Sequence, residues 1–249
     1  MKIAVFTDAH ANLPALQAAL GAIRAERCDA IYHTGDAIAI GPYPSECMDL
    51  LLNTPNVHLI MGNHDAWFAH GLPHPQPPWM SDGEVLHQHW LHSSLDQSLR
   101  PVVARWPYVV QESFEGVRVA FLHYASADSA SGFALSLRNP TPGDLDEIFA
   151  PYRADVLFYG HNHFASDMYS LDGQTRYVNP GSLGCHAEAA ARFVVLECSA
   201  GHYKLEKHAI PYDDTLLFET FERRQVPERE FICQTFFGGR NRPVCENET

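Results

Sequence analysis

Positively charged residues are scarce in this sequence. Lys and Arg account for 17 of its 249 residues, against 30 Asp and Glu, which gives a formal net charge of −13. Binding to long nucleic acids or to anionic membrane surfaces depends on clustered Lys and Arg side chains, so the charge balance disfavours both kinds of partner. It does not exclude a small anionic substrate, because bound metal ions would add local positive charge.

Long apolar runs and paired cysteine motifs are missing as well. No apolar stretch approaches the ~20 residues that span a bilayer as a helix, so we expect no membrane-embedded segment. The six cysteines include no C-x-x-C pair, and Lys2 is followed at once by a strand-like run rather than by a charged and apolar leader. We therefore expect reduced cysteines and a cytoplasmic protein.

Strand-like and helix-like segments alternate in the first part of the chain, and this pattern predicts parallel strands joined by helical crossovers. Such crossovers are nearly always right-handed, and the carboxyl ends of the strands then share one edge of the sheet. The predicted strands cover residues 2–7, 30–34 and 57–61, and the predicted helices cover 13–27 and 44–52.

The remaining chain is organised differently. A Pro-rich loop opens an insertion at about residues 70–101, with a helix-like stretch at 82–94, and we interpret this insertion as a lid over the site. Strand-like segments and hairpin signals such as Asp172-Gly173 follow. The chain ends in a helical tail, about 212–249, whose polar residues 241–249 are expected to be mobile. Two sheets packed face to face and flanked by helices would accommodate both halves in a single domain, residues 1–249. The predicted strands of this half cover 108–112, 117–123, 156–159, 167–170, 175–178, 193–197 and 203–208, and the helices cover 144–149, 213–224 and 228–237.

Five separate apolar runs each end in Asp, Asn or His. Every one of these motifs is weak evidence alone, since each occurs by chance in many proteins. Together they place potential metal ligands on loops at strand ends, where a rigid sheet would hold them in position. The sequence therefore predicts one polynuclear metal centre. The motifs are Asp8-Ala9-His10, Gly35-Asp36, Gly62-Asn63-His64-Asp65, His123 and Gly160-His161-Asn162-His163.

The order of these motifs resembles the calcineurin-like metallophosphoesterase superfamily, whose pattern is D-x-H, G-D, G-N-H-D or G-N-H-E, a lone His and G-H-x-H. The resemblance covers about residues 1–200 and implies an α/β fold, a four-layer α/β/β/α sandwich of two mixed sheets. Asn12 and the segment Asn179 to Ser182 are similar to positions in the compact prokaryotic phosphoesterases. Gly41 to Pro44 resembles a feature of a subgroup that includes bacterial dinucleoside polyphosphate hydrolases.

The resemblance also implies a ligand set for two divalent transition-metal ions per chain. Mixed nitrogen and oxygen ligation suits Mn²⁺, our first expectation, or Fe, Zn²⁺, Ni²⁺ or Co²⁺, better than Ca²⁺ or Mg²⁺. Two adjacent cations would polarise a phosphate and activate a water. The implied ligands are Asp8, His10, Asp36 and His163 for metal one, and Asp36, Asn63, His123 and His161 for metal two.

Three polar residues near the ligands have roles that differ from ligation. His64 adjoins Asn63 and is expected to act as a catalytic acid on the leaving oxygen. Asn12 resembles a phosphate-contacting position of the family, but it also stands where a helix N-cap would. Asp65 is expected to cap the following helix or to support the ligands.

The sequence favours a metal-dependent hydrolase that cleaves a phosphodiester or phosphoanhydride bond of a nucleotide-type small molecule. No spare cluster of Lys or Arg lies near the motifs to neutralise the dianion of a phosphomonoester. A phosphomonoesterase or protein phosphatase is the alternative, whereas a non-catalytic scaffold or a nucleotide sensor agrees less well with an intact ligand set. The expected partner is a small phosphorylated substrate, and a homo-oligomer stays open.

Overall fold

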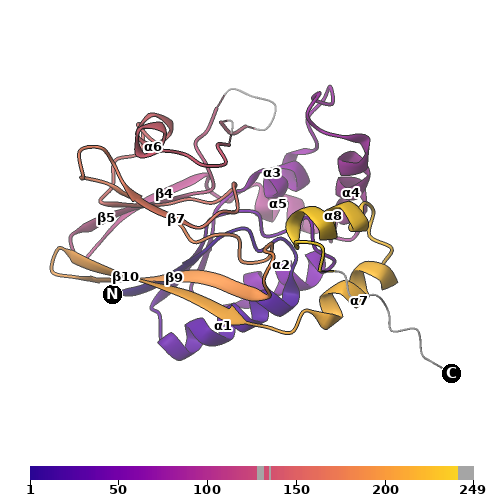
Figure 1. Cartoon of the computed structure of the whole chain (residues 1–249), viewed down its shortest axis with the longest axis horizontal. Coiled ribbons are helices and arrows are strands. Elements are labelled where there is room, and N and C mark those ends of the chain that lie inside the picture. Colours follow the sequence, from indigo (N-terminus) through magenta and orange to yellow (C-terminus); the bar gives the residue numbers. More distant parts are fainter. Residues whose placement is uncertain (128–131, 135, 241–249) are drawn as a thin grey trace.

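Two five-stranded sheets pack face to face in the computed structural model, which describes residues 1–127, 132–134 and 136–240. Figure 1 shows a helical layer outside each sheet: α1 (Leu13–Glu26) lies along the sheet that contains β9 (Ala190–Ser199) and β10 (His202–Pro211), and α6 (Pro142–Ile148) covers the other sheet. These four layers are the predicted α/β/β/α sandwich of two mixed sheets, so the fold prediction is confirmed.

The first sheet has the strand order β10-β9-β1-β2-β3. β1 (Lys2–Phe6) pairs in parallel with β2 (Ala30–His33), which pairs in parallel with β3 (Val57–Leu59), whereas β9 runs antiparallel to β1. The crossover helices α1 and α2 (Pro44–Asn53) bury their apolar stripes in the core on the outer face of this sheet. The carboxyl ends of β1, β2 and β3 therefore share one edge, as the sequence predicts.

The second sheet has the strand order β4-β5-β6-β8-β7 and is parallel from β5 through β6 to β8. Alternate residues of β5 pack on opposite faces: Val119 and Phe121 belong to the core between the sheets, and Leu122 belongs to the core beneath α6. Tyr32 from the first sheet stacks on Phe121, with ring centroids 3.9 Å apart. The strands are β4 (Val109–Phe114), β5 (Val117–Leu122), β6 (Val156–Phe158), β7 (Ser166–Tyr169) and β8 (Arg176–Asn179).

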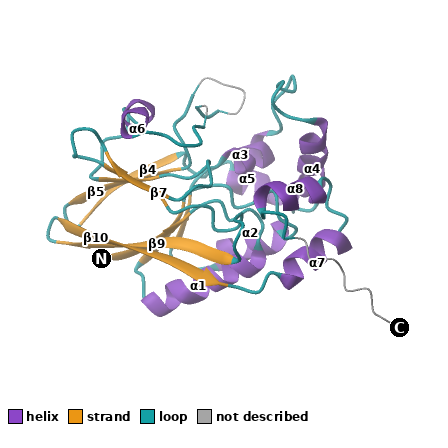
Figure 2. Cartoon of the chain, in the orientation of Figure 1, coloured by secondary structure: helices purple, strands orange, loops and turns teal. Residues whose placement is uncertain are grey.

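Helices from two distant parts of the chain gather at one end of the sheets. Figure 2 shows loops, in teal, filling the space between these helices and the strands. A hydrogen bond joins the two groups, since His87 Nδ1 lies 3.2 Å from the carbonyl oxygen of Pro227. The helices of the inserted region are α3 (Asn63–His70), α4 (Asp82–Ser93), the 3-10 turn Gln97–Leu99 and α5 (Arg100–Val103), and those of the tail are α7 (Thr215–Arg223) and α8 (Arg229–Phe236).

The structure differs from the sequence-based expectations in a few elements. β9 and β10 each extend over ten residues and form a longer hairpin than predicted, because their cross-strand pairing continues beyond the apolar positions. The short helices around residues 97–103 were not predicted, since three or four residues cannot display a helical period. The predicted mobile stretch 241–249 lies outside the described residues. None of the helices in the described part of the chain is long and apolar enough to cross a membrane.

Candidate metal centre

All seven predicted metal ligands converge on one place at the shared edge of the two sheets. Backbone hydrogen bonds fix the loops against one another: Asp8 N donates to the carbonyl oxygen of Gly35 at 3.0 Å, and Gly160 N donates to that of His123 at 2.9 Å. The ligand loops follow β1, β2, β3, β5 and β6, so both sheets contribute side chains. The predicted ligands are Asp8, His10, Asp36, Asn63, His123, His161 and His163.

The first group of ligand atoms surrounds Asp8 Oδ1. This oxygen lies 3.5 Å from His10 Nε2 and 3.4 Å from His163 Nε2, and the two imidazole nitrogens face each other at 2.9 Å. Asp36 Oδ2 lies 3.9 Å from His10 Nε2. Donors bound at about 2.1 Å to one tetrahedral or octahedral cation lie roughly 3.0–3.4 Å apart, so this group has the size of a single metal site.

The second group shares the same carboxylate oxygen. Asp36 Oδ2 lies 3.2 Å from His123 Nε2, which lies 3.2 Å from Asn63 Oδ1. His161 Nδ1 completes the group at 3.0 Å from Asn63 Oδ1 and 3.3 Å from His123 Nε2. The two groups thus meet at Asp36, which agrees with the ligand assignment that the family resemblance implies.

Hydrogen bonds behind the imidazoles aim their lone pairs into the centre. His10 Nδ1 lies 3.2 Å from the carbonyl oxygen of Ile38, and His123 Nδ1 lies 2.9 Å from that of Thr34. Because a carbonyl accepts, each Nδ1 carries the proton and each Nε2 is free to bind a cation. The buried Asp8 Oδ1 has no hydrogen-bond partner within the described residues, which also fits a cation at this position.

Backbone strain is concentrated at the ligands. Five of the seven have positive φ angles between 46° and 73°, a region that non-glycine residues rarely occupy. Each such residue costs on the order of 1–3 kcal/mol, and strain of this kind clusters at functional sites. The five residues are Asp8, His10, Asp36, His161 and His163.

Two glycines of the sequence motifs are required by close approach. A Cβ atom on Gly62 would lie 2.2 Å from Asp36 Oδ1, and one on Gly160 would lie 2.7 Å from Asp8 Oδ2 and 2.0 Å from Thr7 Oγ1. Any side chain at these positions would therefore displace a ligand carboxylate.

Asp65 supports the centre without joining it. Its carboxylate accepts hydrogen bonds from the backbone N–H groups of Asp36, Ala37 and Gly62, at 2.8, 3.1 and 3.1 Å. The last of these is one half of a capping box at the start of α3, and Gly62, which has no side chain, cannot supply the other half. Both expected roles of Asp65, as a helix cap and as support for a ligand, are present together.

The charges of the centre favour a bound cation. Burial raises the pKa of Asp8, but the imidazoles of His163 and His10 outweigh it and hold that pKa well below its usual range. Burial lowers the pKa of His123, yet the carboxylate of Asp36 raises it to about 9. The negative potential that holds a proton on His123 Nε2 would equally hold a divalent cation there.

His64 lies beside the ligands and is held by the inserted helix. Gln88 on α4 donates from Nε2 to His64 Nδ1 at 2.8 Å, which leaves the proton of the neutral ring on Nε2. Burial lowers the pKa of His64 to about 3, so the ring is neutral in this state. A ligand atom of His64 also lies within 4.8 Å of ligand atoms of His10 and Asp36, and its expected non-ligand role stays a prediction.

Asn12 is fully buried, and its side chain is occupied by structural hydrogen bonds. Its Oδ1 accepts from Ala15 N at 3.1 Å and caps α1, and its Nδ2 donates to Gly184 O at 2.7 Å and to Tyr212 Oη at 2.9 Å. The helix-cap role is thus present. The phosphate contact stays a prediction that this geometry does not support.

A cavity of about 690 Å³ opens over the ligands. Its wall includes Arg138 and Arg192, which the loop after β5 and strand β9 bring in from distant parts of the sequence. The sequence shows no cluster of Lys or Arg near the motifs, and these two separate arginines reach the cavity through the fold instead. Arg192 is paired with Glu188 at 3.0 Å, whereas Arg138 lies over the ring of Phe164 and has no carboxylate partner within the described residues. The cavity is therefore suited to an anionic group.

A second cavity of about 360 Å³, the side pocket, adjoins the first and shares Ile40, His64 and Phe236 with it. The inserted helix α4 and the tail helix α8 form its walls. Sequence reasoning missed Gln88 and Phe236, which come from these two helices, as well as Cys185, whose sulfur lies within 4.8 Å of the ligand nitrogens of His10 and His163. No local motif marks any of the three.

Comparisons with known proteins find a similar sequence and similar folds. An uncharacterized protein of Methanocaldococcus jannaschii is 24% identical over 96% of this chain and 98% of its own length. A hypothetical protein of Pyrococcus horikoshii OT3 has the same fold with a TM-score of 0.79, at 21% identity over 95% of this chain and 97% of that one. A metallophosphoesterase from Sphaerobacter thermophilus has a TM-score of 0.70, at 21% identity over 92% of this chain and 96% of that one.

Residues 1–201 match the family described as the calcineurin-like phosphoesterase superfamily domain. This family implies divalent metal ions, and the described residues contain His and Asp groups that fit them. The chain belongs to the calcineurin-like phosphoesterase superfamily.

Proposed function

We propose that the protein is a dinuclear metal-dependent phosphoesterase that hydrolyses a phosphodiester or phosphoanhydride bond of a nucleotide-type small molecule. The observation that carries this proposal is the sharing of Asp36 Oδ2 by two groups of ligand atoms, with His10 Nε2 on one side at 3.9 Å and His123 Nε2 on the other at 3.2 Å. A carboxylate between two such groups is the arrangement by which proteins hold two cations close together. Mn²⁺ is the expected ion, since the ligands mix imidazole nitrogen with carboxylate and amide oxygen.

When bound, the two cations would stabilise the charge of a phosphate and activate a water molecule. The chain itself orients the ligands through the carbonyl groups behind His10 and His123. His64 is neutral and keeps its hydrogen on Nε2 through its hydrogen bond with Gln88, so this N–H would stabilise a leaving oxygen by donating a hydrogen bond to it. Phe236 of α8 lies against His163, with ring centroids 5.7 Å apart and the rings tilted by 50°.

The bond type follows from the space around the centre. Two cavities meet beside His64, so a phosphate at the ligands would have room for a substituent on either side. A phosphodiester or phosphoanhydride has two such substituents, whereas a monoester has one. Arg138 would be available to a further phosphate of an anhydride, but it would also suit the dianion of a monoester, which makes a phosphomonoesterase or protein phosphatase the second candidate.

A substrate panel tests the proposal. Protein loaded with Mn²⁺ should hydrolyse bis(4-nitrophenyl) phosphate or diadenosine tetraphosphate with a higher kcat/KM than 4-nitrophenyl phosphate at the same pH. A clear preference for the monoester would favour the second candidate. Absence of hydrolysis across the panel, in protein with a full metal content, would leave a nucleotide sensor or a scaffold instead.

A further inference from the structure

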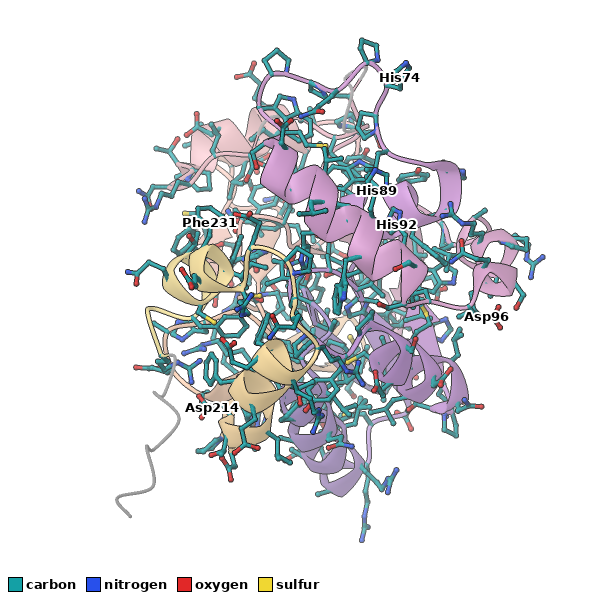
Figure 3. The ribbon with its side chains drawn as sticks, turned by 90° about the vertical axis from the view of Figure 1, so that its right-hand side faces the viewer. His74, His89, His92, Asp96, Asp214 and Phe231 are labelled. Atoms are coloured by element: carbon teal, nitrogen blue, oxygen red, sulfur yellow. The ribbon has the colours of Figure 1, made fainter. Side chains whose placement is uncertain are left out.

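The side pocket is enclosed by aromatic rings that are unusually exposed to solvent. Trp79 precedes α4 and is 54% exposed, and Phe231 on α8 is 60% exposed. Phe236 forms the boundary with the main cavity. Figure 3 shows Phe231 projecting from α8 at the surface, on the face where α4 passes. Large aromatic side chains gathered around an open pocket suit a planar ligand that stacks against them.

The same pocket has hydrogen-bond acceptors without partners. Gln88 is 1% exposed, and its Oε1 has no hydrogen-bond partner within the described residues, because the amide uses its Nε2 on His64. A buried polar atom of this kind costs roughly 1–3 kcal/mol unless a ligand satisfies it. Gln88 lines the side pocket, although Oε1 itself is almost fully shielded from solvent.

Two carboxylates of the pocket also lack cationic partners in the described part of the chain. Glu84 on α4 and Glu228 just before α8 both line it, and neither takes part in an ion pair there. Glu228 is close to the first turn of α4, since a Cβ atom on Gly83 would lie 2.5 Å from Glu228 Cδ. Burial raises the pKa of the Glu84 carboxyl, as expected for an acid that lacks a hydrogen-bond donor.

We propose that the side pocket binds the guanine base of the substrate's leaving group, an inference that rests on the proposed phosphoesterase function. Guanine is planar and presents adjacent N1–H and N2–H donors, which one carboxylate accepts together. Adenine would turn its N1 lone pair towards the same carboxylate, which is unfavourable. A quaternary ammonium group has no N–H to donate to these carboxylates. His64, which is expected to act on the leaving oxygen, lines the side pocket. The group bound in the side pocket would therefore be the one that leaves the phosphorus.

Equilibrium binding tests the pocket without depending on turnover. Full-length protein loaded with Mn²⁺ is titrated in a calorimeter with guanosine 5′-monophosphate, adenosine 5′-monophosphate and ribose 5-phosphate, which share the phosphate and differ in the base. The guanine nucleotide should bind about tenfold more tightly than the adenine nucleotide, the discrimination expected of one bidentate base contact. Ribose 5-phosphate should bind more weakly than either.

Matched variants then identify the contacts. Glu84→Gln and Glu228→Gln should reduce the preference for guanine over adenine, whereas Glu230→Gln, an exposed acid on α8 outside the pocket, should preserve it. Phe231→Ala should weaken both nucleotides by about five- to tenfold and leave ribose 5-phosphate unchanged, because stacking does not depend on the identity of the base. Leu86→Ala is the control for an exposed apolar residue on α4.

Three outcomes would overturn the inference: equal binding of all three phosphates, tighter binding of the adenine nucleotide, or binding of phosphocholine above that of the guanine nucleotide. If the protein prefers guanine but hydrolyses no substrate of the panel, the inference about the side pocket stands and the proposed function is wrong. If the protein cleaves bis(4-nitrophenyl) phosphate but binds the guanine and adenine nucleotides equally, the proposed function stands and the inference about the side pocket is wrong.

Discussion

Replacing Asp36 by Asn is the most direct test of a shared metal centre. The substitution keeps the shape of the side chain but removes the negative charge and converts one oxygen to an amide nitrogen, which cannot bind a cation. Because Asp36 Oδ2 belongs to both groups of ligand atoms, both cations should be lost together. Changing residues that merely support a ligand costs about 10–100-fold in metal affinity, so losing the ligand itself should exceed 100-fold at each site.

The loss should also appear in thermal stability. A cation present at about 100 times its Kd stabilises the folded chain by about 2.7 kcal/mol. In a chain of this size about 1 kcal/mol corresponds to roughly 2–4 °C in Tm, so chelation should lower the Tm of the wild-type protein by about 5–10 °C per site. The Asp36→Asn variant should show almost no response to chelator, since it holds little metal.

The assay combines metal analysis, melting curves with and without chelator, and hydrolysis of bis(4-nitrophenyl) phosphate. Asp49→Asn, which alters an exposed acid on α2, is the matched control and should behave as wild type. Asp36→Asn protein that is folded, carries about two cations per chain and retains full activity would refute the shared ligand. Loss of a single cation would refute it as well, because it would assign Asp36 to one site.

Further predictions address the acid, the insertion and a bond between the sheets. His64→Ala should keep both metals but slow hydrolysis by about 10²–10⁴-fold, with a smaller decrease in rate for the good leaving group nitrophenolate. Gln88→Leu should show the same dependence on the leaving group with a smaller decrease in rate. Loss of metal in either variant would contradict these roles. Shortening the loop at 72–78 should change relative rates for nitrophenyl and nucleotide substrates without changing metal content, and unchanged rates would contradict the lid. Asp167, whose pKa Arg176 and then Lys207 lower to about 2, should stabilise the protein by about 1 kcal/mol after solvent screening above pH 4. Because the folded pKa is below the unfolded value, this contribution is lost as the pH falls towards 2, so melting curves of Asp167→Asn and wild-type protein should converge there.

The ligands could be predicted from the sequence because each belongs to a short motif at the end of an apolar run. Asp36 lies three residues after the end of β2, and the parallel arrangement of β1 and β2 then brings it to Asp8 without further information. Gln88 and Arg138 could not be predicted in this way. Gln88 reaches His64 across 24 residues of chain, and its position depends on how α4 packs at the end of the sheets. Hydrophobic periodicity indicates that a helix exists but not where it lies.

The strained ligand loops explain why metal binding and folding should be coupled in this protein. Asp8 and Asp36 are buried within a few ångströms of four imidazoles, and both have left-handed backbone conformations. In the absence of cations the sheets alone must hold these residues in place, at a cost on the order of 1–3 kcal/mol for each strained residue, and two buried carboxylates remain incompletely neutralised. A pair of divalent cations would offset both costs at once. The chelation experiment measures this coupling as the free energy of metal binding: a fall in Tm confined to protein with an intact Asp36 would show that the metal centre stabilises the folded chain.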